Sequence, residues 1–108
     1  MTEKIVKKLV TRQILSESWG QRADLVMEDN FSIQEYTVNS KDKIQINLDN
    51  EDVHFILVAG CAEFSFNDEK KMLFKGDKTD FATKNKKLNI TITNCGVIPL
   101  TFVKIRIR

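Results

Sequence analysis

Hydrophobic and polar residues alternate with a period of two along most of this chain, in short runs separated by turn-forming residues. In one run, Ile44, Ile46 and Leu48 alternate with Gln45 and Asn47. The same alternation recurs over residues 62–66, 88–93 and 103–107. Successive side chains of a strand point to opposite faces of a sheet, so this period predicts β-strands with one buried face. Turns recur at about ten-residue spacing, which is typical of a β-sandwich or barrel.

Three segments depart from simple alternation. Residues 53–59 are almost wholly apolar, which predicts a central strand buried on both faces. In residues 31–38 the apolar positions change parity midway, and we expect a β-bulge there. Residues 67–70 read Asn-Asp-Glu-Lys and predict a hairpin turn.

The pattern as a whole predicts an all-β fold, a jelly-roll β-sandwich or barrel with two facing sheets and little helix. We expect residues 11–108 to form a single domain and residues 1–10 to be an N-terminal arm or edge strand. The residues expected in the core are Leu48, Phe55, Leu57, Phe64, Ile90 and Val103.

Composition is that of an ordinary globular protein. The chain has 108 residues, of which 42% are hydrophobic and 30% charged. No apolar run approaches the ~18 residues that span a bilayer, so we expect no membrane association. Residues 1–8 contain no apolar core of signal-peptide length, and we expect a cytoplasmic protein.

The net charge is +2, and lysines are scattered through every segment. A small group at Lys84, Lys86 and Lys87 could contact a sugar phosphate as point charges, although the sequence favours a solvated polar turn. Nucleic-acid binding needs basic groups that converge with aromatic residues between them, and the sequence does not show this.

Metal-binding and redox chemistry have few candidates in the sequence. Cys61 and Cys95 lie far apart in the chain, and the only histidine is His54. Two thiols and one distant histidine are short of the four ligands of a structural zinc site. We therefore expect two reduced, partly buried cysteines without a disulfide.

Two motifs resemble those of the cupins. Residues 44–60 have the order of the first cupin motif, a strand, a short loop and a strand that ends at Gly60. Residues 73–88, which include a Gly76-Asp77 turn, resemble the second motif. Trp19-Gly20 at the start of the domain is similar to the small cupin domain of type II mannose-6-phosphate isomerases and mannose-1-phosphate guanylyltransferases. The resemblance covers about residues 11–107.

In that family, a His-x-His pair, a glutamate and a later histidine hold a divalent metal inside the barrel. By the resemblance, these positions fall on Leu48, Asn50 and Val53 and near Lys87. Aliphatic side chains offer no lone pair to a metal, so we expect neither metal nor cofactor. Together with Trp19, which either caps the barrel or stacks on a sugar, these residues are the candidate lining of a pocket.

The resemblance therefore implies two alternatives. The first is a degenerate, metal-free cupin that acts as a binding or assembly module, with a sugar phosphate or nucleotide sugar as its ligand. The second is a sugar-phosphate isomerase or epimerase-like enzyme of mannose and nucleotide-sugar metabolism that uses acid–base residues. The sequence favours the first, because it identifies no catalytic residue. His54 lies on the strand face opposite Val53 and is expected at the surface.

A homodimer is expected for two reasons. Small cupins commonly pair, as the resemblance implies. In addition, the arm of residues 1–10 carries four aliphatic side chains among its lysines, which need cover either from a partner subunit or from the domain itself. They are Ile5, Val6, Leu9 and Val10.

Overall fold

The computed structural model describes residues 13–108, and these form ten β-strands joined by turns. In chain order the strands are β1 (Gln13–Glu17), β2 (Gly20–Met27), β3 (Phe31–Val38), β4 (Lys43–Asp49), β5 (Asp52–Ala59), β6 (Cys61–Phe66), β7 (Glu69–Phe74), β8 (Lys78–Ala82), β9 (Lys87–Asn94) and β10 (Leu100–Ile107). Within the described residues there is no helix, and so none that could cross a membrane. The predicted all-β class is confirmed.

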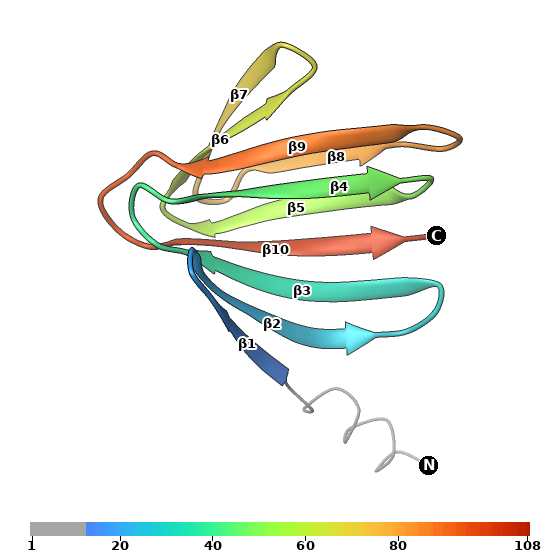
Figure 1. The fold of residues 1–108 in the computed structure, drawn as a ribbon, viewed down its shortest axis with the longest axis horizontal. Coiled ribbons are helices and arrows are strands. Elements are labelled where there is room, and N and C mark those ends of the chain that lie inside the picture. Colours follow the sequence, from blue (N-terminus) through green and yellow to red (C-terminus); the bar gives the residue numbers. More distant parts are fainter. Residues whose placement is uncertain (1–12) are drawn as a thin grey trace.

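The strands form two antiparallel sheets that face each other. The larger sheet has six strands in the order β1-β2-β3-β10-β5-β8, and the smaller has four in the order β4-β9-β6-β7. In Figure 1, β4 and β9 of the smaller sheet overlap in projection with β5 and β8 of the larger sheet, while β1, β2 and β3 extend the larger sheet toward the lower edge of the view. This confirms the jelly-roll sandwich. The predicted arm, residues 1–10, lies outside the described residues.

The core lies between the sheets and follows the period-two pattern. The burial of β4 alternates strictly, with Ile44, Ile46 and Leu48 inside. Aromatic rings fill the centre: the rings of Phe55 and Phe64 have centroids 5.3 Å apart and meet edge to face. The expected core residues Leu48, Phe55, Leu57, Phe64 and Ile90 are all buried.

Val103 is the wrong member of the expected core. On β10 the fully buried side chains are Leu100 and Phe102, and Val103 is only half-buried on the other face. The register with β5 shifts between Thr101 and Phe102, which marks a β-bulge or irregularity. Residues two apart on a strand share a face, so Lys104 points between the sheets on the same side as Phe102.

The predicted bulge in β3 is also wrong. Burial alternates without a break along this strand, and the inward side chains are Ser32, Gln34, Tyr36 and Val38. The apparent change of parity arises because polar residues occupy half of the buried face. The register shift lies instead in the neighbouring β2, between Asp24 and Val26.

The outer face of the larger sheet is more apolar than the sequence suggested. Strand β5 was expected to be buried on both faces, but Ile56 and Val58 on its outer face are 36% and 44% exposed. Val103 lies directly opposite Ile56, and Ile105 lies directly opposite Ile33. We call Ile33, Ile56, Val58, Val103 and Ile105 the outer patch.

The turns use residues suited to positive φ. Asn67 and Asp68 have φ of 47° and 63° and connect β6 to β7, which confirms the predicted hairpin. Gly60 has φ of 88°, and a Cβ there would lie 3.1 Å from both the Leu100 Cα and the Pro99 oxygen. Only glycine readily adopts this positive φ and also lacks the Cβ that would crowd these atoms.

Candidate functional site

The four positions matched to the family's metal ligands do not converge on one site. Leu48 and Val53 are buried, at 1% and 0% exposure. Asn50 is exposed, and its side-chain oxygen accepts a 2.9 Å hydrogen bond from the Asn85 backbone N–H. Lys87 is also exposed, opposite Asp49, whereas the next residue, Leu88, lies opposite Leu48 and packs on the core.

On the β8 side, aromatic rings pack beside Val53 in the interior. Phe81 lies directly opposite Val53 and is itself buried. Its ring centroid is 5.9 Å from that of Phe55 and 6.5 Å from that of Phe64. Among residues 13–108, no three side chains of His, Cys, Asp or Glu come together as a metal-binding group. These side chains do not fit a divalent metal, because they offer it no donor set.

Polar side chains gather instead on the inner face of β2, β3 and β10. Asp24 and Lys104 lie directly opposite Gln34, on either side of it, and Arg22 lies opposite Tyr36. Directly opposite residues of antiparallel strands point to the same face of the sheet. These groups therefore share the inward face that Tyr36 and Phe102 occupy.

A short hydrogen-bonded chain connects β2 and β3. The Gln34 amide donates to the Asp24 carboxylate at 2.8 Å, and the Tyr36 hydroxyl donates to the Gln34 side-chain oxygen at 3.4 Å. Arg22 Nε lies 3.2 Å from the same Asp24 oxygen, so the two charges are paired. The Nε–H is nevertheless buried and makes no hydrogen bond, because its direction does not suit that oxygen.

A second group surrounds Glu51, in the loop between β4 and β5. Glu51 is buried, and its Oε2 lies 3.8 Å from Arg106 Nε and 3.7 Å from Arg108 Nε. Thr83 fixes the loop: its hydroxyl accepts from the Glu51 N–H at 3.1 Å and donates to the Glu51 carbonyl oxygen at 2.8 Å. Arg106 Nε is also buried without a hydrogen bond.

Charged residues of both groups affect the pKa of Lys104. Burial lowers the pKa of Lys104 below its ordinary value; Glu51 opposes this shift, and Arg106 and Arg22 lower the pKa further. Burial also raises the pKa of Tyr36, against the effect of Arg22. We call the four cations and two carboxylates of these groups the basic cluster; its members are Arg22, Asp24, Glu51, Lys104, Arg106 and Arg108. The basic cluster has more positive than negative charges, so a bound anion would balance its charge.

Trp19 stands beside this cluster. Its ring stacks on Tyr36 with centroids 5.9 Å apart, and Tyr36 stacks in turn on Phe102 at 5.0 Å. Trp19 also lines a surface hollow of about 590 Å³ together with Lys41 and Lys43. The residue thus covers the end of the aromatic core and reaches the surface.

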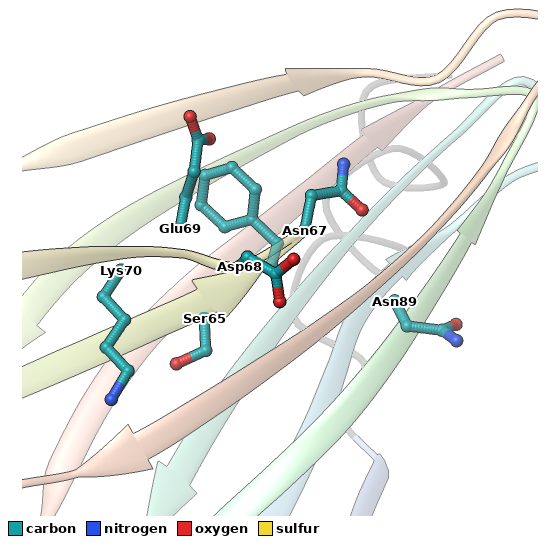
Figure 2. Close-up of a pocket in the computed structure, with 7 residues that line it drawn as sticks. Ser65, Asn67, Asp68, Glu69, Lys70 and Asn89 are labelled. Carbon is teal, nitrogen blue, oxygen red and sulfur yellow. The ribbon is translucent and has the colours of Figure 1, made fainter.

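A second hollow, of about 450 Å³, lies at the β6–β7 hairpin. Figure 2 shows its side chains spread around the turn, with Asn89 standing apart from the others. The nearest ion pair joins Lys70 and Glu63 at 3.9 Å, and both side chains reach solvent. Side chains so dispersed have no arrangement suited to chemistry.

His54 lies on the outer face of the larger sheet, as expected. Its Nδ1 is 2.7 Å from an Asp80 carboxylate oxygen on β8. The hydrogen bond with His54 lowers the pKa of Asp80. This exposed pair is separated from the basic cluster by the sheet.

Sequence reasoning missed most of the basic cluster. Because Val103 was expected in the core, the alternation over residues 103–107 implied that Lys104 and Arg106 face solvent. The available signal was on β3, where Ser32 and Gln34 precede Tyr36 at two-residue spacing. Such polar residues on a buried face mark a site that packing alone does not explain.

Comparison with known proteins agrees with this architecture. The profile of the mannose-6-phosphate isomerase C-terminal family matches residues 6–108. No curated protein sequence matches the chain.

Solved structures share the fold at low sequence identity. A protein of Photorhabdus luminescens matches with a TM-score of 0.74 and 20% identity, over 89% of this chain and 81% of its own. An uncharacterized double-stranded β-helix protein from Klebsiella pneumoniae also scores 0.74, with 17% identity over 94% and 85% of the two chains. A cupin-superfamily sugar phosphate isomerase from Silicibacter pomeroyi scores 0.64, with 16% identity over 81% and 59%. The chain therefore has the cupin fold and belongs to the mannose-6-phosphate isomerase C-terminal family, with other residues at the positions of the metal ligands.

Proposed function

We propose that this chain is a metal-free cupin that acts as a binding module for a phosphorylated sugar or nucleotide sugar. The observation that carries the proposal is the basic cluster, which sets four cations against two carboxylates on the inner face of β2 and β10 and at the adjoining end of the larger sheet. Arg22 and Arg106 each keep a buried Nε–H without an acceptor. A phosphate oxygen could accept a hydrogen bond from such a guanidinium group. Because the chain belongs to this family, we expect the phosphate to be attached to a sugar.

Trp19 suits the other part of such a ligand. An indole ring can stack on the apolar face of a sugar, and Trp19 lies next to Tyr36 at the margin of the basic cluster. The phosphate would then contact Arg22, and the sugar would lie over Trp19.

An isomerase or epimerase-like activity is the second candidate. It needs a group that moves a proton at neutral pH. Lys104 has a lowered pKa and lies within the electrostatic reach of Glu51, so it is the residue of this cluster best suited to act as a base. The binding proposal needs no such step and stands without it.

A thermal-shift series tests binding. A ligand that binds only the folded state raises its melting temperature. We expect mannose 6-phosphate and nucleotide sugars to stabilise the protein and free mannose to have little effect. Arg22→Gln should weaken binding by about tenfold, since a hydrogen bond to a charged group contributes about 1.5–3 kcal/mol.

Matched variants locate the site. Lys75→Gln removes one positive charge from an exposed turn and should leave binding unchanged. Lys87→Gln tests the site expected from the family spacing. If Lys87→Gln abolished binding while Arg22→Gln preserved it, the basic cluster would not be the site.

We also propose that the protein is a cytoplasmic homodimer, with the outer patch rather than the arm alone as its interface. The patch is apolar, its Ile56 and Val58 are exposed, and a two-fold axis would bring like residues of two copies together. Ile56→Lys should dissociate the dimer in light scattering. A wild-type mass near the 12.5 kDa monomer at micromolar concentration would refute it.

A further inference from the structure

The two cysteines, which lie far apart in the sequence, come together in the fold. Cys61 begins β6, and Cys95 directly follows β9. The ladder between these strands pairs Ala62 with Asn94, so one more step in the same register places the cysteines opposite each other. Their sulfur atoms are 3.1 Å apart, and both are free thiols. The sequence predicted two reduced, partly buried cysteines; both are free thiols, and Cys95 is exposed rather than partly buried.

The backbone geometry at this point suits a disulfide. Opposite residues of antiparallel strands have Cα atoms about 4.5–5.5 Å apart, within the range that disulfides span. The sulfurs need to approach by only about 1 Å to reach bonding distance. Cys95 is exposed and Cys61 is partly buried, so a small oxidant has access to the pair.

The loop after β9 is already held in place. The buried Asn94 side chain donates to the carbonyl oxygens of Val38, at 3.0 Å, and Ile98, at 2.9 Å, and accepts from the Gly96 N–H at 2.9 Å. The Ser40 hydroxyl donates to the Gly96 oxygen at 2.9 Å. Cys95 is therefore presented to Cys61 by hydrogen bonds that do not depend on its own sulfur.

We propose that Cys61 and Cys95 are an oxidation site at which a hydroperoxide forms a reversible disulfide. One thiolate attacks the peroxide, the O–O bond breaks, and a sulfenic acid and one water (from hydrogen peroxide) result. The second thiolate then attacks the sulfenic sulfur, the S–S bond forms, and another water leaves. A dithiol reductant reverses the step by thiol–disulfide exchange and is itself oxidised.

The bond would fasten the β9–β10 loop to β6. This loop exposes two apolar side chains, Val97 at 86% and Ile98 at 54%. In the reduced protein hydrogen bonds help to hold the loop, and oxidation adds a covalent link at its first residue. The oxidised protein should therefore present Val97 in a more rigid loop.

The chemistry should be slow at neutral pH. Partial burial and then the hydrogen bond with Cys61 raise the pKa of Cys95 to about 11. Since the thiolate is the reactive species, oxidation should accelerate as the pH rises toward that value.

The test is to treat the full chain with hydrogen peroxide and map its peptides without reduction. We expect a cross-linked peptide pair that joins Cys61 to Cys95, loss of both free thiols, and recovery of the thiols with dithiothreitol. Cys95→Ser should retain one titratable thiol and give no internal link. Disulfide-linked dimers alone, or separate oxidation of each cysteine to sulfinic acid, would overturn the proposal.

Stability gives an independent readout. Closing the loop between residues 61 and 95 should raise the melting temperature of the oxidised wild type by about 10 °C over the reduced form. Peroxide-treated Cys61→Ser should show no such rise. An oxidised wild type that melts below the reduced form would mean that the cysteines cannot bond without distorting the sheet, and would also count against the proposal.

Discussion

The inward-facing side chains of the larger sheet are apolar on β5 and largely charged on β10 and β2. On β5 the inward side chains are apolar, and Val53 lies directly opposite the buried Phe81 of β8. One strand away on β10, the residue opposite Val53 is Arg106. In the next row of paired residues, Phe55 on β5 lies opposite Lys104 on β10. Lys104 in turn lies opposite Gln34 on β3, and Gln34 lies opposite Asp24 on β2.

The difference separates residues that stabilise the fold from residues that need another explanation. Apolar rings between the sheets stabilise the domain by leaving water. Buried charges lose hydration, and a well-packed hydrophobic replacement is often as stable or more so. At the positions matched to the family's metal ligands, the apolar side has packed hydrocarbon at Leu48 and Val53, whereas the charged side carries groups that packing does not require.

The largest effect should come from the apolar side. Phe55 has no exposed surface, and its ring contacts those of Phe64, Phe81 and Phe102. Phe55→Ala should lower the free energy of unfolding by about 3–5 kcal/mol in urea titrations. Phe74→Ala, at a ring that is 56% exposed, is the matched control and should change it by less than about 1 kcal/mol. Equal losses in the two variants would contradict the described core.

A smaller loss should follow removal of the carboxylate of the charged side. Glu51→Gln leaves Arg106, Arg108 and Lys104 without their shared counter-ion, which should lower stability by about 2 kcal/mol. Added phosphate should then stabilise Glu51→Gln more than wild type, because it can replace the lost negative charge. Glu69→Gln, at an exposed position, is the control. An equal response of Glu51→Gln and wild type to phosphate would argue against an anion site here.

The smallest effect should be a gain. Burial lowers the pKa of Lys104, so the unfolded chain holds this proton more tightly than the folded one. The charged form therefore destabilises the fold at neutral pH, and the penalty fades as pH rises through the lowered pKa toward 10.5. Lys104→Met should stabilise the protein by about 1 kcal/mol at pH 7.

The pH dependence of that gain provides the check. The difference between Lys104→Met and wild type should shrink as the pH approaches 10.5, measured by urea unfolding at a series of pH values. The difference is the useful quantity, because Tyr36 has a raised pKa and adds its own dependence at high pH to both proteins. If the stability difference between Lys104→Met and wild type instead grew with pH, the Lys104 ammonium would not be destabilising the fold as expected.

Much of the fold was predictable from period-two alternation, because one face of most strands is buried. The prediction failed where both faces of a strand carry apolar residues or where polar residues face inward. On β10, Val103 and Ile105 belong to the outer patch, and their apolarity concealed Lys104 on the inner face. On β3, inward Gln34 imitated a bulge.

The candidate site was less predictable, because it depends on register between strands far apart in the chain. Spacing within one motif located Leu48 and Val53 on the interior, but it could not show that Leu88 rather than Lys87 lies opposite Leu48. The meeting of Arg22 with Tyr36, and of Cys61 with Cys95, likewise depends on pairings that no local pattern contains.

The position of β10 has a consequence for how the domain is made. This strand lies between β3 and β5, although it follows both by more than 40 residues. On a ribosome, β3 and β5 therefore emerge long before their shared neighbour, with unpaired N–H and C=O groups along the edges that await it. The larger sheet can close only after synthesis has passed β10. Folding should thus be a late event dominated by distant pairings, which places it among the slower small domains, on a scale of about milliseconds to seconds.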